Sequence, residues 1–189
     1  MMRFWQAMAF FYAIPMFLNA EEQVKPFVWL PPPVQVSSFS NDLGLLDSER
    51  EEYATNLATI GSNLVVEAKA SPPSLAAARR MIGLALQLSP RNKKAVVVSF
   101  QLAKGMLPTV ADSNYSPQVF ARLLVTRGQL LDKQGGDENK RLARLFMQLA
   151  AELDPKNEDA VYLSEVQRLD HGVIDWKTIT DPPEKSPQP

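Results

Sequence analysis

The amino-acid sequence predicts an all-α protein: an antiparallel array of about six helices arranged as helix hairpins, preceded by an extended proline-rich arm. Three observations support this fold class. Apolar residues recur at spacings of three and four, which is typical of amphipathic helices. Proline or paired glycines interrupt the pattern at the intervals that short turns require. Finally, the segment 78–99 resembles the segment 143–164, a fixed offset of 65 residues, as expected of stacked helical units.

The chain divides into four parts. These are a signal peptide at 1–20, an extended arm at 21–46, a helical domain at 47–176 and a disordered proline-rich tail at 177–189. Proline fixes the backbone and removes amide donors, so Pro26 and the run 31–33 favour an extended arm over a helix. Phe27 and Trp29 are expected to pack on the helical domain or on another protein.

Capping residues and breakers delimit the helices. The expected helices cover residues 48–69, 75–88, 92–104, 117–134, 137–153 and 157–169. Ser48 with Glu51 fits a capping box at the start of the first helix, and Gly61 is a candidate break inside it. The second helix ends before Pro90. The third is apolar nearly all round, which predicts burial between neighbouring helices.

The later helices have equally clear boundaries. Ser116-Pro117 is a cap followed by proline in the first turn. Gly135-Gly136 ends that helix, and Asp137 caps the next. Asp154-Pro155 then separates the fifth helix from the sixth.

The two repeated segments carry the same small and turn-forming residues at the same offsets. Ala78, Ala85, Pro90 and Ala95 correspond to Ala143, Ala150, Pro155 and Ala160. Small residues let helices approach closely, and the proline ends a helix so that the chain can reverse. In this pattern the chain resembles the tetratricopeptide-repeat family, at the junction between two repeats. The resemblance implies stacked helix hairpins that bind other proteins; a helical bundle without repeats is the alternative.

The sequence departs from that family at Phe100 and Glu165, which stand where the family has glycine. The sixth helix also begins a repeat whose second helix is missing, and terminal repeats need a cap. Val173, Ile174 and Trp176 are expected to fold back as that cap. Otherwise an apolar face around Val161 and Leu163 stays exposed as a docking or dimer surface.

Basic side chains are the candidate partner contacts, because basic residues in repeat grooves bind carboxylates. They are expected on the inner face of helices two to six, at Arg79, Arg91, Lys94, Arg122, Arg127 and Arg144. For the turn 91–94, a solvated surface is the plainer interpretation.

No set of residues predicts catalysis, a cofactor or a metal ion. His171 is the single histidine and the chain has no cysteine; a histidine after a helix end is explained by the helix dipole. The carboxylates of Glu49, Glu51 and Glu52 complement the dipole at a helix start in the same way. The formal net charge is −1, so a nucleic-acid partner is not expected.

Residues 1–20 have one charge, at Arg3, and then an uncharged stretch to Ala20. This order predicts a secretory signal peptide cleaved after Ala20, which places the protein in the periplasm of a bacterium or outside the cell. A membrane anchor is the alternative, because 4–20 reaches the lower length limit of a spanning helix, about 17 residues.

The sequence thus predicts an exported, non-catalytic protein–protein interaction module, a scaffold or adaptor in the cell envelope. Its partner is another protein or peptide. One alternative is a structural protein anchored in the inner membrane by its uncleaved N-terminal helix. Another is a structural subunit that assembles with itself, and a small enzyme that depends on His171 is the third.

Overall fold

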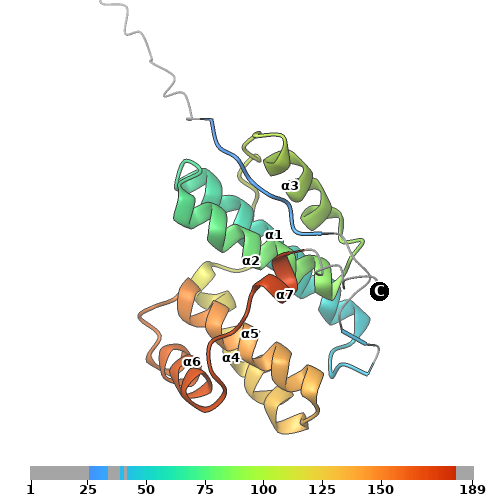
Figure 1. Cartoon of the computed structure of the whole chain (residues 1–189), viewed down its shortest axis with the longest axis vertical. Helices are drawn as coiled ribbons and strands as arrows, with labels where there is room; N and C mark the ends of the chain where they lie inside the picture. The colour runs from blue at the N-terminus through green and yellow to red at the C-terminus, as the bar shows by residue number, and fades with distance from the viewer. Residues whose placement is uncertain (1–25, 34–38, 41, 182–189) are drawn as a thin grey trace, which may run out of the picture.

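The described part of the chain is built from seven helices. The structure is a computed structural model that describes residues 26–33, 39–40 and 42–181. The helices are α1 Asp47–Glu67, α2 Pro72–Leu88, α3 Lys93–Ala103, α4 Pro117–Gln134, α5 Asp137–Leu153, α6 Glu158–His171 and α7 Lys177–Thr180 (Figure 1). Since every regular element in these residues is helical, the all-α prediction is confirmed. The predicted signal peptide lies outside the described residues.

Side-chain caps fix where three helices begin. The Asn92 side chain accepts a hydrogen bond from the amide of Ala95 at 2.9 Å, and Asn157 accepts one from Ala160 at 3.1 Å. Ser116 caps α4 in the same way. These bonds satisfy amides that lack an acceptor within the helix.

The predicted capping box at Ser48 is wrong. Helix α1 begins one residue earlier, and its capping carboxylate is Glu49, which accepts a hydrogen bond from the amide of Leu46 at 2.8 Å. The carboxylate of Glu51 is used elsewhere: it accepts hydrogen bonds from Ser89 at 2.6 Å and Asn92 at 2.8 Å. Glu51 therefore ties the α2–α3 turn to α1.

The helices form two units of three. Helices α1 and α2 pack along each other, as do α4 and α5; α3 adds to the first pair and α6 to the second. The 65-residue offset relates α2–α3 to α5–α6. The six alanines of the repeated pattern are fully buried: Ala78, Ala85, Ala95, Ala143, Ala150 and Ala160. Pro90 and Pro155 lie just after the ends of α2 and α5.

A glycine allows close packing in each helix pair. Helix α1 continues through Gly61, so the expected break is not there. A Cβ at Gly61 would lie 3.3 Å from Cβ of Met81 on α2, and one at Gly128 would lie 3.2 Å from the carbonyl oxygen of Ala143 on α5. Both glycines face the partner helix, and a larger side chain would push the pair apart.

Large side chains join the two units. The ring of Tyr53 on α1 lies 6.1 Å from that of Phe120 on α4 and 5.1 Å from that of Phe146 on α5, centroid to centroid. Arg80 of α2 pairs with Glu152 of α5 at 2.8 Å. The core is thus continuous from one unit to the other.

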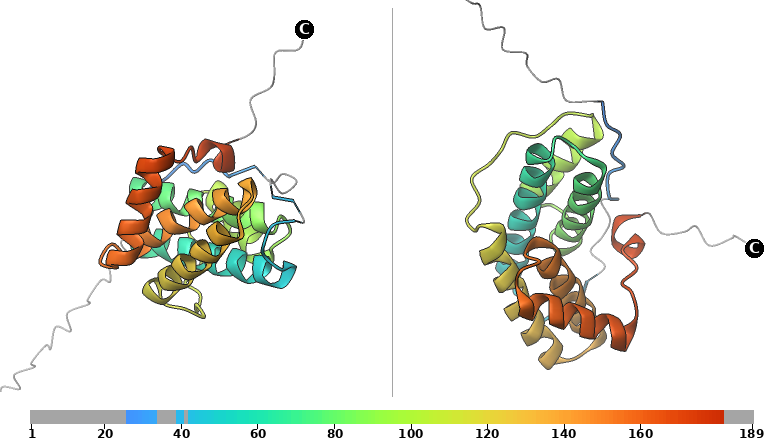
Figure 2. Two further views of the ribbon diagram at one scale, coloured as in Figure 1. Left: turned by 90° about the horizontal axis from the view of Figure 1, so that it is seen from below. Right: turned by 90° about the vertical axis from the view of Figure 1, so that its left-hand side faces the viewer.

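Two irregular segments cross from one unit to the other (Figure 2). The N-terminal strap, residues 26–33, 39–40 and 42–45, has no strand or helix in these residues. Its Trp29 is 6% exposed and donates a hydrogen bond from Nε1 to the carbonyl of Leu75 on α2 at 3.2 Å. Further along, Ser40 binds Glu138 and Gly44 binds Asn139, both on α5.

The C-terminal strap, residues 172–181, corrects the predicted start of the disordered tail. Residues 177–180 form α7, which packs on α2. Ile179 is buried there, in contact range of Gly83. Sequence periodicity does not reveal a single helical turn, because four residues are too few to show it. The rest of the predicted tail, 182–189, lies outside the described residues.

The predicted cap folds back, but over different helices. Trp176 donates a hydrogen bond to Gln148 of α5 at 3.1 Å, and Arg80 of α2 stacks over its ring. Val173, by contrast, is 79% exposed. The strap therefore covers α2 and α5, and the outer face of α6 stays open.

Replacing either packing glycine by valine should destabilise the protein by about 1–3 kcal/mol, the usual cost of overpacking. The added methyl groups of Gly61→Val or Gly128→Val would meet the backbone or Cβ of the facing helix. Denaturant unfolding measures the loss. Ala76→Val, at an exposed α2 position, is the control for the lower helix propensity of valine, and should cost well under 1 kcal/mol. Equal losses in all three variants would contradict the close-packing role.

Candidate functional site

Three of the six basic residues predicted to contact a partner bind the chain itself. Arg79 contacts both straps: Nε donates to the carbonyl of Leu30 at 2.8 Å, Nη2 to the carbonyl of Thr180 at 2.9 Å, and Nη1 pairs with the carboxylate of Asp181 at 2.8 Å. The Arg79 guanidinium thus holds Leu30 and Thr180 against α2, although they lie 49 and 101 positions away from it in sequence.

Arg127 and Arg144 act in the same way. Arg127 donates to the carbonyl of Gly44 at 2.6 Å and pairs with Glu49 at 2.8 Å. Arg144 donates to the carbonyl of Gly172 at 2.9 Å and that of His171 at 3.3 Å. These carbonyls lie outside the regular hydrogen-bonding of helices. The bond to Gly44 is part-buried, so that carbonyl is shielded from water and benefits most from a side-chain donor.

The other three predicted contacts, Arg91, Lys94 and Arg122, form no hydrogen bond or ion pair with any residue that the structure describes. Arg91 and Arg122 are exposed and Lys94 is half-buried. Whether any of the six contacts a partner stays a prediction, but these three have their charges unused within the described chain.

The carboxylates at the start of α1 are satisfied internally. Glu49 pairs with Arg127, Glu51 binds the α2–α3 turn, and Glu52 accepts the hydroxyl of Tyr115 at 3.0 Å. That hydrogen bond raises the pKa of Tyr115. Within the described residues, no group of three or more His, Asp or Glu side chains is placed to hold a metal ion.

His171 lies at the exposed C-terminal end of α6. Its ring forms no hydrogen bond with the described residues, including the neighbouring Asp170 and Asp175. The Asp175 carboxylate instead accepts the amide of Lys177 at 3.0 Å. The geometry therefore does not place an oriented acid–base pair at this position.

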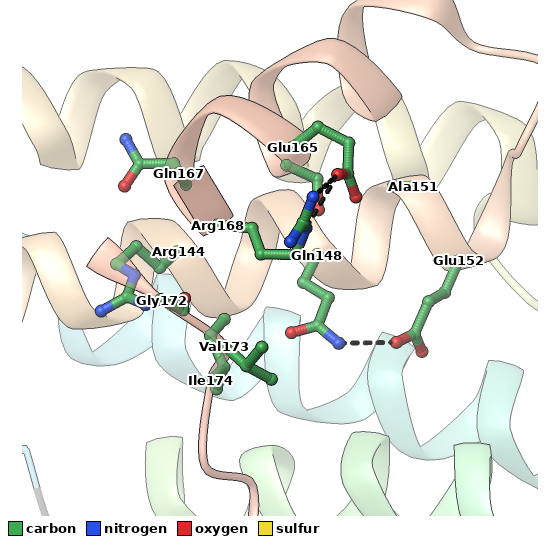
Figure 3. Close-up of a pocket in the computed structure, with 11 residues that line it drawn as sticks. Arg144, Gln148, Ala151, Glu152, Glu165, Gln167, Arg168, Gly172, Val173 and Ile174 are labelled. Carbon is green, nitrogen blue, oxygen red and sulfur yellow. Dashed lines mark hydrogen bonds and ion pairs between the residues drawn. The ribbon is translucent and has the colours of Figure 1, made fainter. Parts of the chain in front are cut away.

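A cavity of about 270 Å³ lies between α5, α6 and the C-terminal strap (Figure 3). Two of its charged side chains pair with each other, Glu165 with Arg168 at 2.7 Å (Figure 3). Glu152 accepts a hydrogen bond from Gln148 at 2.9 Å and pairs with Arg80 outside the cavity at 2.8 Å. Arg144 at its edge binds the strap. A charged ligand would have to displace these internal bonds.

Two further cavities lie at other junctions. One of about 250 Å³ is formed where the C-terminal strap crosses α2, between Arg80 and Trp176. The other, about 120 Å³, lies between α1 and α4 and is lined by Tyr53 and Glu52. Burial raises the pKa of Tyr53 to about 12, so this phenol stays protonated at neutral pH. In the cavity beside α2, the Thr180 hydroxyl donates to the Asp181 carboxylate at 2.9 Å, and that carboxylate is also paired with Arg79.

The outer face of α3 is the strongest candidate surface. Lys93, Val97, Phe100 and Lys104 follow at spacings of four, three and four residues, and all four are exposed, Phe100 to 60%. Only the opposite side, with Ala95, Val98, Ser99 and Leu102, is buried. The prediction that α3 is buried all round is therefore wrong, because α1 and α2 cover just one of its sides.

No protein-family model, no curated protein and no solved structure matches this chain. The resemblance to tetratricopeptide repeats thus stays a prediction from the sequence. Among the described residues, no helix is both long enough and apolar enough to cross a membrane.

Replacing Arg79 by lysine should release both straps, because an ammonium lacks the planar set of donors that reaches three acceptors at once. We expect amide hydrogen exchange in residues 26–33 and 174–181 to rise roughly ten-fold, which corresponds to about 1.4 kcal/mol. Mass spectrometry of exchanged peptides measures the effect. Arg122→Lys, an exposed position without contacts in the described residues, is the matched control. Unchanged exchange in both straps would contradict the role of Arg79.

Acid should loosen the same straps. Hydrogen bonds from Ser40 lower the pKa of Glu138, and hydrogen bonds from Thr180 and then Arg79 lower that of Asp181. Because the folded-state pKa values are lowered, the unfolded chain binds more protons, and stability rises with pH through this range. The contribution is complete above the ordinary values of 4.5 and 3.8 and is lost as pH falls through the lowered ones.

The double variant Glu138→Gln/Asp181→Asn tests this. Its unfolding free energy should lie below that of the unmodified protein at neutral pH, and the difference should shrink in acid. Both carboxyls are partly exposed, so solvent screening keeps the effect small. Asp112→Asn, at an exposed loop position, is the control. A difference that does not change with pH would contradict the assignment.

Proposed function

We propose that the chain is a non-catalytic protein-interaction module, a scaffold or adaptor of the cell envelope, which binds an acidic amphipathic helix on the outer face of α3. The observation that carries the proposal is the exposed stripe of Lys93, Val97, Phe100 and Lys104. An apolar centre between cationic ends suits a helix with an apolar stripe and acidic flanks.

The charge around α3 supports this partner class. Residues 91–104 include Arg91, Lys93, Lys94 and Lys104 and no acidic residue, a local charge of +4 in a chain whose net charge is −1. The lysines form no ion pair with the described residues; the Lys104 ammonium lies 5.7 Å from the centre of the Phe100 ring. Unpaired cations around exposed apolar side chains favour an anionic partner over a neutral one.

The repeat-like architecture gives a reason for the open face. In the proposed arrangement, α1–α2 and α4–α5 are degenerate tetratricopeptide-like hairpins, and α3 and α6 are first helices without a second. The contacts of α3 with α1 and of α6 with α4 support it. The missing second helix of a repeat would pack on the outer face of α3, so a helix supplied by a partner can take its place.

Export rests on residues 1–20 alone, which have the order of a signal peptide. The alternative, an uncleaved anchor that holds a structural protein at the inner membrane, uses the same segment. A mature N-terminus at Glu21, read by mass spectrometry, would exclude the anchor.

A photo-crosslinking phenylalanine analogue at position 100, in the full chain in its own cells, tests the docking surface. We expect crosslinks to an acidic amphipathic helix, and a roughly ten-fold lower yield when Lys93→Glu/Lys94→Glu is added, equivalent to about 1.4 kcal/mol. The same analogue at Leu130, an exposed α4 position, is the control. Crosslinks to lipid, or a yield no higher than at Leu130, would contradict the proposal.

A further inference from the structure

The outer face of α6 is the counterpart of that of α3. Shifting by 65 residues maps Lys93, Val97, Phe100 and Lys104 onto Glu158, Tyr162, Glu165 and Leu169. These four residues of α6 are also exposed, Tyr162 to 68%. The repeat therefore places two open helix faces on one molecule. The α3 face has Val97 and Phe100 at its centre, whereas the α6 face has Tyr162 and Glu165 there and Leu169 at its end.

The two faces have opposite charge. Residues 93–104 contain three lysines and no acidic residue, so their formal charge is +3. The corresponding residues 158–169 contain Glu158, Asp159 and Glu165 against one arginine, so their formal charge is −2, and Asp170 follows directly. Lysines at positions 93 and 94 correspond to carboxylates at 158 and 159.

The opposed charges are free to act between molecules. Of the four carboxylates, Glu165 alone forms an ion pair in the described residues, with Arg168 at 2.7 Å. Glu158, Asp159 and Asp170 form no hydrogen bond or ion pair through their side chains there, and neither do the three lysines of the α3 face. Three cations without an ion pair thus lie beside Val97 and Phe100 on α3, and three anions without one lie beside Tyr162 and Leu169 on α6.

The positions of the faces decide how they can meet. Helix α3 lies in the upper part of the view in Figure 1 and α6 in the lower part, with the α1–α2 and α4–α5 pairs between them. One molecule therefore does not cover its own α3 with its own α6. A contact between α3 of one copy and α6 of the next leaves one face open at each end, which continues the assembly head to tail.

We infer that the acidic amphipathic helix that binds α3 is α6 of a second copy of this chain, so that copies join head to tail. This inference rests on the proposed function and names the partner. Like-with-like pairing is disfavoured, because two α3 faces bring lysines together and two α6 faces bring carboxylates together.

Charge reversal tests the inference in the purified full chain. The unmodified protein should form chains whose length grows with concentration and falls with added salt, since surface charges are screened. Sedimentation velocity measures this. Lys93→Glu/Lys94→Glu makes both faces acidic, and Glu158→Lys/Asp159→Lys makes both basic. Each variant alone should associate at least roughly ten-fold more weakly.

Mixing the two variants is the decisive step. The acidic α3 of the first then meets the basic α6 of the second, and the acidic α6 of the first meets the basic α3 of the second. Chains should form again, in which the variants alternate. A variant that had lost its fold would not be rescued in this way, so the mixture separates folding from docking. Lys133→Glu/Lys140→Glu, at exposed positions without side-chain contacts in the described residues, should leave assembly unchanged.

Three results would overturn the inference. They are an unmodified protein that stays monomeric at all concentrations, variants that do not assemble on mixing, and chains that the control disrupts equally. If the protein is monomeric but the analogue at position 100 crosslinks to an acidic helix of a different protein, the proposed function stands and the self-partner is rejected. If it is monomeric and position 100 gives no protein crosslink above the control, both are rejected.

Discussion

Contacts between arginine side chains and carbonyl groups hold the irregular backbone of the two straps onto the helices. Helices satisfy their own carbonyls, whereas the straps do not. The carbonyls of Ser40, Gly44 and Thr180 accept part-buried bonds, where a missing donor costs most; a fully buried carbonyl without one costs about 1–3 kcal/mol. Arg79 provides donors to both straps at one place on α2. Arg127 donates to the carbonyl of Gly44 in the N-terminal strap, and Arg144 donates to that of Gly172 in the C-terminal strap. The buried Arg50 donates to the carbonyl of Ser40 at 2.7 Å.

These contacts explain how two three-helix units make one core. Each unit presents an apolar side to the other through Tyr53, Phe120 and Phe146. The straps cover the junction between the two units, and Trp29 and Ile179 are buried against α2. They use the surface near the junction and leave the distal helices α3 and α6 with one side uncovered. The same arrangement that stabilises the middle of the molecule therefore exposes its ends.

The sequence predicts the parts of this fold that local physics determines. Periodicity, proline and asparagine caps locate α2 to α6, because each signal acts within a few residues. Arg79 could not be assigned from sequence, since its acceptors lie 49 and 101 residues away and are backbone atoms that every residue has. The apolar content of α3 predicted burial, but burial also requires a neighbour, and only the structure reveals that α3 lacks one on its outer side.

The repeated pattern gives the strongest reason to compare the two open faces. The packing residues of the two segments are alike, since the six alanines at corresponding positions are all buried. The outer faces differ in sign, with Lys93 and Lys94 opposite Glu158 and Asp159. Solubility alone needs charge but no particular sign at either end. Opposite charges on α3 and α6 favour a directional contact between copies, because two α3 faces or two α6 faces repel each other whereas α3 and α6 attract.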